Sequence, residues 1–282
     1  MYEQLTRQEL DQQYSPSSRA PDYQAILRRY RELSDGARQR FRHEADVSYG
    51  TSAAETLHFF PSARPSADIH VFVHGGHWQE SSKEDACFAA PAFLRAGAAF
   101  IALGYGLAPE RTLDDMVHSV RRGLWWVAEH ARDLGVRPGG VYAGGSSAGA
   151  HLVAMAVAHT GATPPPVAGV ALLSGVYDLE PVRHSYVNER VGMSRCTAQA
   201  NSPVGHLPLA TPRVLVARGV AETREYARQQ QLFVDALRAA GQACADHVIE
   251  GRNHFDLPLD LGDPATRLGR AVLAQMDLLS DR

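Results

Sequence analysis

The chain has 282 residues, enough for one α/β domain with a substantial core. Hydrophobic residues make up 45% and charged residues 21%, and the net charge is −3, which argues against disorder and against a basic surface for nucleic acid. The start MYEQLTRQELDQQY lacks the apolar core of a signal peptide, and no long apolar run predicts a membrane span.

These properties predict a single domain over residues 1–282 and a cytoplasmic location. The expected partner is a small-molecule substrate, with neither nucleic acid nor membrane, and a homodimer is the assembly to test. Cys87, Cys196 and Cys244 lack the spacing of a zinc or redox site, so we expect reduced, buried thiols and no metal.

The first part of the chain, residues 1–44, is predicted to be helical. Thr6 and Glu9 match a capping box, which predicts a short helix there, and a second helix is expected over Tyr23–Ala37. The next stretches, DVSYG and TLHFF, predict two antiparallel strands, because Gly50 and Thr51 lie where a turn is needed.

From residue 69 onward, apolar strand-like runs alternate with helical periodicity. Ile69–Val73 and Ala98–Leu103 flank a helical stretch at Lys83–Ala96, which predicts a βαβ unit. Further strands are expected at 139–143, 167–174, 213–217 and 245–249, and further helices at 112–134, 151–159, 222–240 and 264–279. This alternation predicts an α/β fold with a doubly wound, mostly parallel sheet.

Residues 177–212 lack clear periodicity and contain several prolines. We expect this stretch to be a short, cap-like excursion that covers the site. No second domain is predicted.

The pentapeptide Gly145-Ser146-Ser147-Ala148-Gly149 lies between an apolar strand and an apolar helix. A G-x-S-x-G motif in this context places its serine on a strained strand-to-helix turn and exposes the hydroxyl oxygen. The motif predicts Ser147 as a nucleophile, with Ser146 pointing elsewhere. The alternative, a phosphate-binding loop, lacks the expected lysine.

His74-Gly75-Gly76-His77-Trp78 ends the first long strand. Such a loop places backbone N–H groups against a developing oxyanion, so Gly75, Gly76 and the N–H of Ala148 are the candidate donors. His74 is expected to anchor the loop by hydrogen bonding. His77 and Trp78 are candidates for the substrate pocket or for packing under the loop, and the sequence leaves this open.

The catalytic base and acid are expected late in the chain, in the order serine, acid, histidine. His254, in a loop after the last predicted strand, is the candidate base. Glu222 is the candidate acid, which would orient the imidazole and stabilise its cation. Glu225 is the rival acid, Asp178 is the next candidate, and Glu222 could instead only cap the following helix.

With these residues in place, the sequence resembles the kynurenine formamidase (arylformamidase) branch of the α/β-hydrolases, which is related to carboxylesterases of the hormone-sensitive lipase type. The segments that carry the resemblance extend over nearly the whole chain: HGGHW at 74–78, GYGLAPE at 104–110, GGSSAGAHL at 144–152, SGVYDLEP at 174–181, Asn201-Ser202-Pro203, GVAETREYARQQ at 219–230 and GRNHFD at 251–256.

The resemblance implies the α/β-hydrolase fold, a role in tryptophan catabolism and Ser147, Glu222 and His254 as nucleophile, acid and base. Tyr177 and Asn253, in two of the shared segments, join His77 and Trp78 as pocket candidates. His77 departs from the family, since relatives often have Tyr or Phe there.

Three functions follow as hypotheses. The first is a serine hydrolase that cleaves an aryl formamide such as N-formylkynurenine to the arylamine and formate through an acyl-enzyme, with no metal or organic cofactor. The second is a carboxylesterase acting on small aryl or short-chain esters with the same residues. The third is a non-catalytic binding protein of the same fold.

Overall fold

The computed structural model describes residues 4–211 and 213–279. The predicted boundaries at residues 1, 212 and 282 lie outside these ranges. A single eight-stranded sheet runs through the described part, in the order β1-β2-β4-β3-β5-β6-β7-β8. Strand β2 is antiparallel to both β1 and β4, and all other neighbours are parallel. This topology confirms the predicted mostly parallel α/β sheet and the antiparallel pair at its start.

The strands are β1 Glu44–Ser48, β2 Thr56–Phe60, β3 Ala67–Val73, β4 Ala99–Leu103, β5 Val136–Ser146, β6 Gly169–Leu173, β7 Arg213–Gly219 and β8 Cys244–Ile249. The main helices are α1 Arg7–Gln13, α2 Tyr23–Arg40, α3 Ala90–Ala96, α4 Leu113–Glu129, α5 Ala148–Ala156, α9 Arg224–Ala239 and α10 Arg267–Gln275. Apart from the exposed residues 137–139 near the start of β5, the central strands β3 to β6 are almost entirely buried, as expected for parallel strands covered by helices on both faces.

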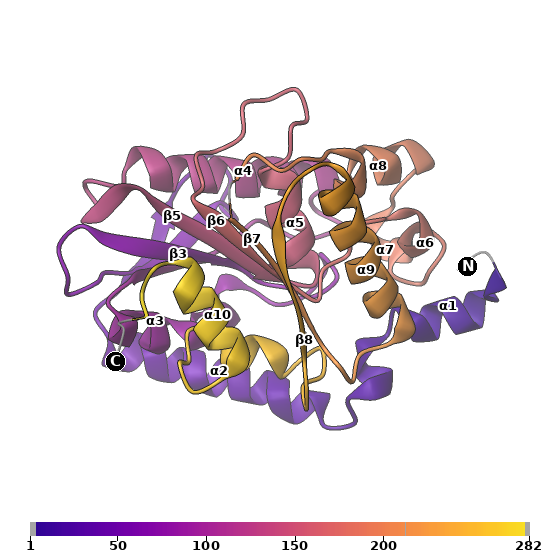
Figure 1. Ribbon diagram of the computed structural model, residues 1–282, viewed down its shortest axis with the longest axis horizontal. Coiled ribbons are helices and arrows are strands. Elements are labelled where there is room, and N and C mark those ends of the chain that lie inside the picture. Colours follow the sequence, from indigo (N-terminus) through magenta and orange to yellow (C-terminus); the bar gives the residue numbers. More distant parts are fainter. Residues whose placement is uncertain (1–3, 212, 280–282) are drawn as a thin grey trace.

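Helices cover the two faces of the sheet separately (Figure 1). Helices α4, α5 and α9 pack on one face, and α2, α3 and α10 lie on the other. Two hydrophobic clusters follow this division, one on each face. The sheet therefore separates two hydrophobic cores, and the loops that carry the candidate site residues follow the ends of its strands.

Some element boundaries differ from the expectation. The stretch Lys83–Ala96 is divided into a 3-10 helix, η3 Lys83–Ala89, and α3, with Pro91 in the first turn of α3. Proline has no N–H to donate, so it fits a helix start better than a helix interior. Helix α5 begins directly after Ser147 rather than at residue 151.

The excursion contains three short helices, α6 Glu180–Arg183, α7 Asn188–Val191 and α8 Arg195–Ala200, and a 3-10 turn, η4 Pro203–Gly205. Helix α1 lies against it, as Figure 1 shows near the N-terminus. Arg7 pairs with Glu189, and Asp11 accepts a hydrogen bond from the Tyr186 N–H. The N-terminal segment and the excursion are thus joined.

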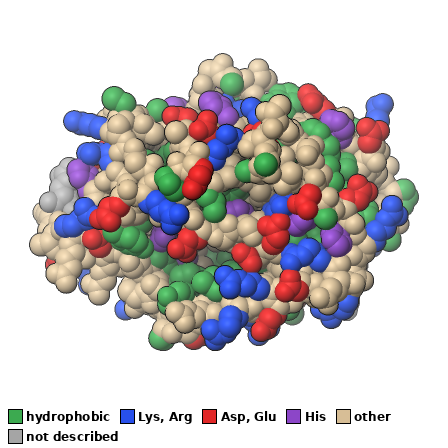
Figure 2. Space-filling view, turned by 180° about the vertical axis from the view of Figure 1, so that it is seen from behind, with side chains coloured by type: hydrophobic (Ala, Val, Ile, Leu, Met, Phe, Trp, Pro, Cys, Tyr) green, Lys and Arg blue, Asp and Glu red, His purple; other side chains and the backbone are tan. Residues whose placement is uncertain are grey.

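Figure 2 shows acidic and basic side chains interspersed over one face of the molecule, in line with the small net charge. In the part of the chain that the structure describes, no helix is both long and apolar enough to cross a membrane. All three cysteines are free thiols, but only Cys87 is buried: Cys244 is partly exposed and Cys196, on the short helix α8, is exposed. The expectation of buried thiols was therefore wrong for Cys196, because a short surface helix leaves most of its positions in water.

His70, on β3, is an imidazole enclosed in the core. Its ring stacks on Phe93 at 4.4 Å, and neither ring nitrogen has a hydrogen-bond partner among the described residues. Burial lowers the pKa of His70 to about 3. A histidine in the unfolded chain binds a proton near pH 6.5, so the unfolded state gains protons first as the pH falls.

Stability is therefore expected to fall as the pH drops below about 6.5, by about 1.4 kcal/mol per pH unit from this group. His70→Leu removes this titrating group. Between pH 6.5 and 5, the drop in the free energy of unfolding should therefore be about 2 kcal/mol smaller in the variant than in the wild type. Urea unfolding at both pH values measures the difference. The exposed His118→Leu is the control, and an equal slope in all three proteins would contradict the assignment.

Candidate active site

Ser147 occupies a sharp turn between β5 and α5. Its φ is 55° and its ψ is −118°, a backbone conformation that non-glycine residues rarely adopt. The Ser147 N–H donates to the Leu173 carbonyl at 2.8 Å, which ties the turn to the end of β6. Gly149 is required just beyond it, because a Cβ there would lie 2.1 Å from the Val73 carbonyl oxygen. The turn holds the serine at the carboxyl edge of the sheet.

The loop after β3 lies directly against this serine. A Cβ on Gly75 would lie 2.8 Å from the Ser146 carbonyl oxygen and 3.2 Å from the Ser147 Cβ, so only glycine allows this approach. Ala148 is the first residue of α5, and the N–H groups of a first helical turn have no partner within the helix. Gly75 and Ala148 are thus adjacent to Ser147, and Gly76 lines the same cavity, so these three residues stay the candidates for backbone donors.

His74 holds this loop in place. Its Nδ1 hydrogen-bonds the Gly75 carbonyl at 2.9 Å, and its ring stacks on Tyr105 at 4.4 Å. Burial lowers the pKa of His74 to about 4. A neutral imidazole serving as a loop anchor matches the role expected for this residue.

Glu222 and His254 are in contact as a buried pair, and His254 lines the same cavity as Ser147. His254 Nδ1 lies 2.9 Å from one carboxylate oxygen of Glu222, whose side chain is fully buried. The other oxygen accepts hydrogen bonds from the Ser174 hydroxyl at 2.7 Å and from the Gly219 N–H at 2.6 Å. With Nδ1 bound to the carboxylate, Nε2 is the nitrogen left to exchange protons with a substrate or nucleophile.

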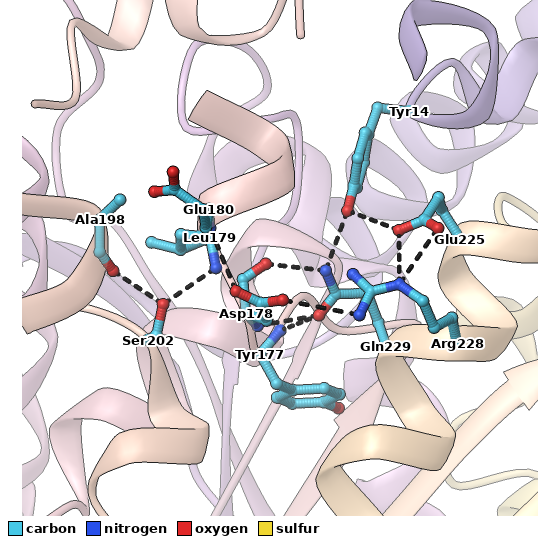
Figure 3. Close-up of polar contacts among 10 residues, drawn as sticks. All are labelled: Tyr14, Tyr177, Asp178, Leu179, Glu180, Ala198, Ser202, Glu225, Arg228 and Gln229. Carbon is cyan, nitrogen blue, oxygen red and sulfur yellow. Dashed lines mark hydrogen bonds and ion pairs between the residues drawn. The ribbon is translucent and has the colours of Figure 1, made fainter. Parts of the chain in front are cut away.

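The two rival carboxylates belong to a separate network around α9 (Figure 3). Glu225 accepts a hydrogen bond from the Tyr14 hydroxyl at 3.1 Å and pairs with Arg228 at 2.8 Å. Asp178 lies 3.5 Å from the Arg228 guanidinium, and its carbonyl accepts from Gln229. The structure therefore brings Glu222, and neither rival, to the His254 imidazole.

Ser147 and His254 line one cavity of about 510 Å³. Its lining includes an aromatic and apolar group beside charged side chains such as Arg31, Glu80 and Asp85. The aromatic and apolar group is Tyr23, Leu27 and Tyr30 from α2, Phe88 from η3 and Phe255 from the loop that carries His254. Rings stack on this wall, since Tyr30 and Phe88 lie 4.7 Å apart at an interplanar angle of 16°. A flat aromatic group fits such a wall.

The four expected pocket residues have different surroundings. His77 lines the cavity. Trp78 is buried and donates its ring N–H to His151 Nδ1 at 3.2 Å, and Tyr177 stacks on Phe233 at 3.9 Å. Asn253 accepts hydrogen bonds from the Phe255 and Asp256 N–H groups and shapes the base loop. Trp78, Tyr177 and Asn253 support the site from behind and are not among the described lining residues.

Among the described residues, side chains of the types that bind metal ions gather away from this cavity, at Asp46, His58 and Glu84. The Lys83 ammonium lies 2.8 Å from Asp46 and 2.5 Å from Glu84, so a cationic side chain already pairs with both carboxylates. None of the three ligand-type residues lines the cavity that holds Ser147.

Comparison with known proteins places this geometry among hydrolases. A kynurenine formamidase of Danio rerio is 31% identical over 96% of this chain and 97% of its own length. Esterase LipQ of Mycobacterium tuberculosis is 27% identical over 76% of this chain and 57% of its own. The BD-FAE family model matches residues 58–164.

The chain belongs to the kynurenine formamidase family. A crystal structure of a putative thioesterase from Silicibacter sp. has the same fold, with a TM-score of 0.84 at 24% identity over 94% of this chain and 98% of that chain. The chain is a hydrolase with the α/β-hydrolase fold.

In this member of the kynurenine formamidase family, two parts of the site were not predicted from the sequence. The N-terminal segment supplies much of the outer wall, whereas Tyr186 is the one described residue of the excursion that lines the cavity. Tyr23, Leu27 and Tyr30 have the spacing of residues on one face of a helix, and this pattern was the signal that could have indicated an apolar surface there.

Tyr226 is the second unforeseen residue. It is buried, and its ring lies 4.4 Å from the His254 ring. Its hydroxyl lies 3.4 Å from His77 Nε2. Nothing in the segment GVAETREYARQQ singled out this tyrosine, because its role depends on a loop far away in sequence.

Replacing Ser147 by alanine should abolish turnover and leave the fold intact, because its hydroxyl is the proposed attacking group. Ser146→Ala should retain most of the activity. Steady-state kinetics and circular dichroism on both variants test this, and an active Ser147→Ala enzyme would show that the nucleophile has been misplaced.

Glu222→Gln should lower kcat by about a hundredfold or more, because an amide cannot stabilise the His254 imidazolium as a carboxylate does. The matched change Glu225→Gln breaks only the contacts to Tyr14 and Arg228 and should have a much smaller effect on kcat. Parallel kcat measurements compare the two. A larger loss for Glu225→Gln would transfer the acid role to that residue.

Proposed function

We propose that this chain is a serine hydrolase that cleaves an aryl formamide, such as N-formylkynurenine, to the arylamine and formate. The carrying observation is that Ser147 and His254 line one aromatic-walled cavity while His254 is bound to the buried Glu222. The likeness to kynurenine formamidase over nearly the whole chain supports the substrate class.

In the first half-reaction, His254 Nε2 takes the Ser147 proton as the serine oxygen attacks the formyl carbon. The carbonyl electron pair moves to oxygen, and the resulting oxyanion accepts hydrogen bonds from the N–H groups of Gly75, Gly76 and Ala148. The C–N bond then breaks, and the leaving nitrogen takes the proton from His254. The arylamine departs and a formyl-serine ester remains.

In the second half-reaction, His254 removes a proton from water as the water oxygen attacks the formyl ester. A second oxyanion forms in the same position and collapses with loss of the Ser147 oxygen, which regains the proton from His254. Formate leaves. Glu222 keeps its charge throughout and stabilises the imidazolium in both halves.

A carboxylesterase is the second candidate, supported by the likeness to esterase LipQ. It would use the same residues and the same intermediates with an alcohol as leaving group. The rates kcat/KM for N-formylkynurenine and for a p-nitrophenyl ester, measured on one preparation, separate the two functions.

For the formamidase, hydrolysis of a formyl-arylamine should exceed that of the matching acetyl- and butyryl-arylamines. Each methylene added to the acyl group must fit a space that a formyl hydrogen fills, and a misfit there raises the free energy of the transition state. The three substrates should be compared by kcat/KM. Rates that rise from formyl to butyryl, with negligible turnover of N-formylkynurenine, would favour the esterase instead.

A further inference from the structure

Tyr226 contacts three parts of the candidate machinery from the first turn of α9. Its ring packs on the His254 imidazole at 4.4 Å, and its hydroxyl lies 3.4 Å from His77 Nε2. Burial raises the pKa of the Tyr226 hydroxyl, and a hydrogen bond from Ser147 acts against that rise. Base, nucleophile and oxyanion loop therefore meet at one tyrosine.

Neighbouring residues hold this tyrosine in place. Just before it, Glu225 is bound by Tyr14, and one turn later Gln229 accepts hydrogen bonds from the Tyr177 and Asp178 N–H groups (Figure 3). Tyr226 itself is 1% exposed. The first two turns of α9 are fixed on both sides, so the Tyr226 ring has little freedom to move aside.

The space around Ser147 is open on the opposite side. The cavity extends toward α2 and η3, and His77 marks its limit near α9. Tyr226 lies behind that limit and is not among the described lining residues. We place the aryl leaving group on the open side, next to Tyr23, Leu27 and Phe88, because the lining there is aromatic and apolar.

The tetrahedral intermediate at Ser147 has three further substituents. The oxyanion faces the backbone donors, and the leaving nitrogen faces His254 and the open cavity. The acyl substituent takes the remaining direction. We propose that the hydrogen-bonded pair of Tyr226 and His77 forms the acyl wall of the site and restricts the acyl group to formyl.

The restriction to formyl rests on the proposed function, whereas the wall itself acts on any acyl group. The hydrogen-bonded pair of Tyr226 and His77 also resists separation of its two side chains. Burial, with a smaller contribution from the neighbouring His254, lowers the pKa of His77 to about 4, so His77 is neutral at pH 7. A bulkier acyl group that displaced either ring would break the Tyr226–His77 hydrogen bond and disturb the packing of the buried Tyr226 ring on His254, which is unfavourable.

The test uses p-nitrophenyl acetate and p-nitrophenyl butyrate, so that it does not depend on the formamide substrate. Tyr226→Leu shortens the wall, and the ratio of kcat/KM for butyrate to that for acetate should rise by roughly tenfold or more. Tyr23→Leu makes the same change on the opposite wall and should leave that acyl ratio within about twofold, whatever it does to KM. Thermal unfolding of each variant controls for folding.

His77→Ala provides a second opening of the wall, on a loop rather than a packed helix. Its acyl ratio should shift in the same direction, so the proposal stays testable if Tyr226→Leu does not fold. An unchanged butyrate-to-acetate ratio in the folded variants would overturn the acyl wall. This holds even if the Tyr226→Leu enzyme is slower with both esters, because a lower rate alone would mean that Tyr226 only supports His254.

The two proposals fail in different ways. Wild-type protein that does not hydrolyse N-formylkynurenine contradicts the formamidase function and leaves the acyl ratios of the variants standing. Wild-type protein that hydrolyses it, with ratios that do not respond to Tyr226→Leu or His77→Ala, contradicts the acyl wall alone.

Discussion

The buried carboxylate of Glu222 is the group on which the geometry of the site depends. It collects the Ser174 hydroxyl at the end of β6, the Gly219 N–H at the end of β7 and the His254 imidazole beyond β8. A buried charge needs several such donors, because its desolvation is otherwise unfavourable. Because the carboxylate binds Nδ1 of His254, Nε2 is the imidazole nitrogen left for the cavity. One carboxylate thus links three strand ends to the proton chemistry.

Hydrogen bonds beyond the first contacts join the remaining parts. His151, in the helix that begins at the nucleophile, accepts from Trp78 in the oxyanion loop and bonds the Asn201 carbonyl of the excursion at 2.8 Å. Burial lowers the pKa of His151 to about 4, which suits a neutral ring with one donor and one acceptor. Helix, loop and excursion are held in one arrangement by a single histidine.

Local sequence signals were sufficient for the mostly parallel sheet and for the strand-to-helix turn at Ser147, whereas the catalytic order of serine, acid and histidine stays a prediction. The G-x-S-x-G turn and the glycines before His77 are local patterns with a direct backbone cause, which is why Ser147, Gly75 and Gly76 could be located in advance. The choice between Glu222 and Glu225 needed coordinates, since both lie near the start of α9 and differ in the direction of their side chains. Tyr226 and the α2 wall depend on contacts between distant segments, which a single sequence does not encode locally.

The aromatic wall contributed by α2 has a consequence for how this enzyme family can change. The reactive groups all come from strand ends and the loops that follow them, whereas Tyr23, Leu27 and Tyr30 belong to a helix that precedes the sheet in the chain. Mutations in that helix would therefore change the cavity wall, and they would also reach the His254 loop, since Tyr30 donates a hydrogen bond to the Phe255 carbonyl and the Tyr23 ring packs on Phe255. Exchange of the N-terminal helical segment between relatives would thus alter the aromatic wall and the support of the His254 loop and of α9 together.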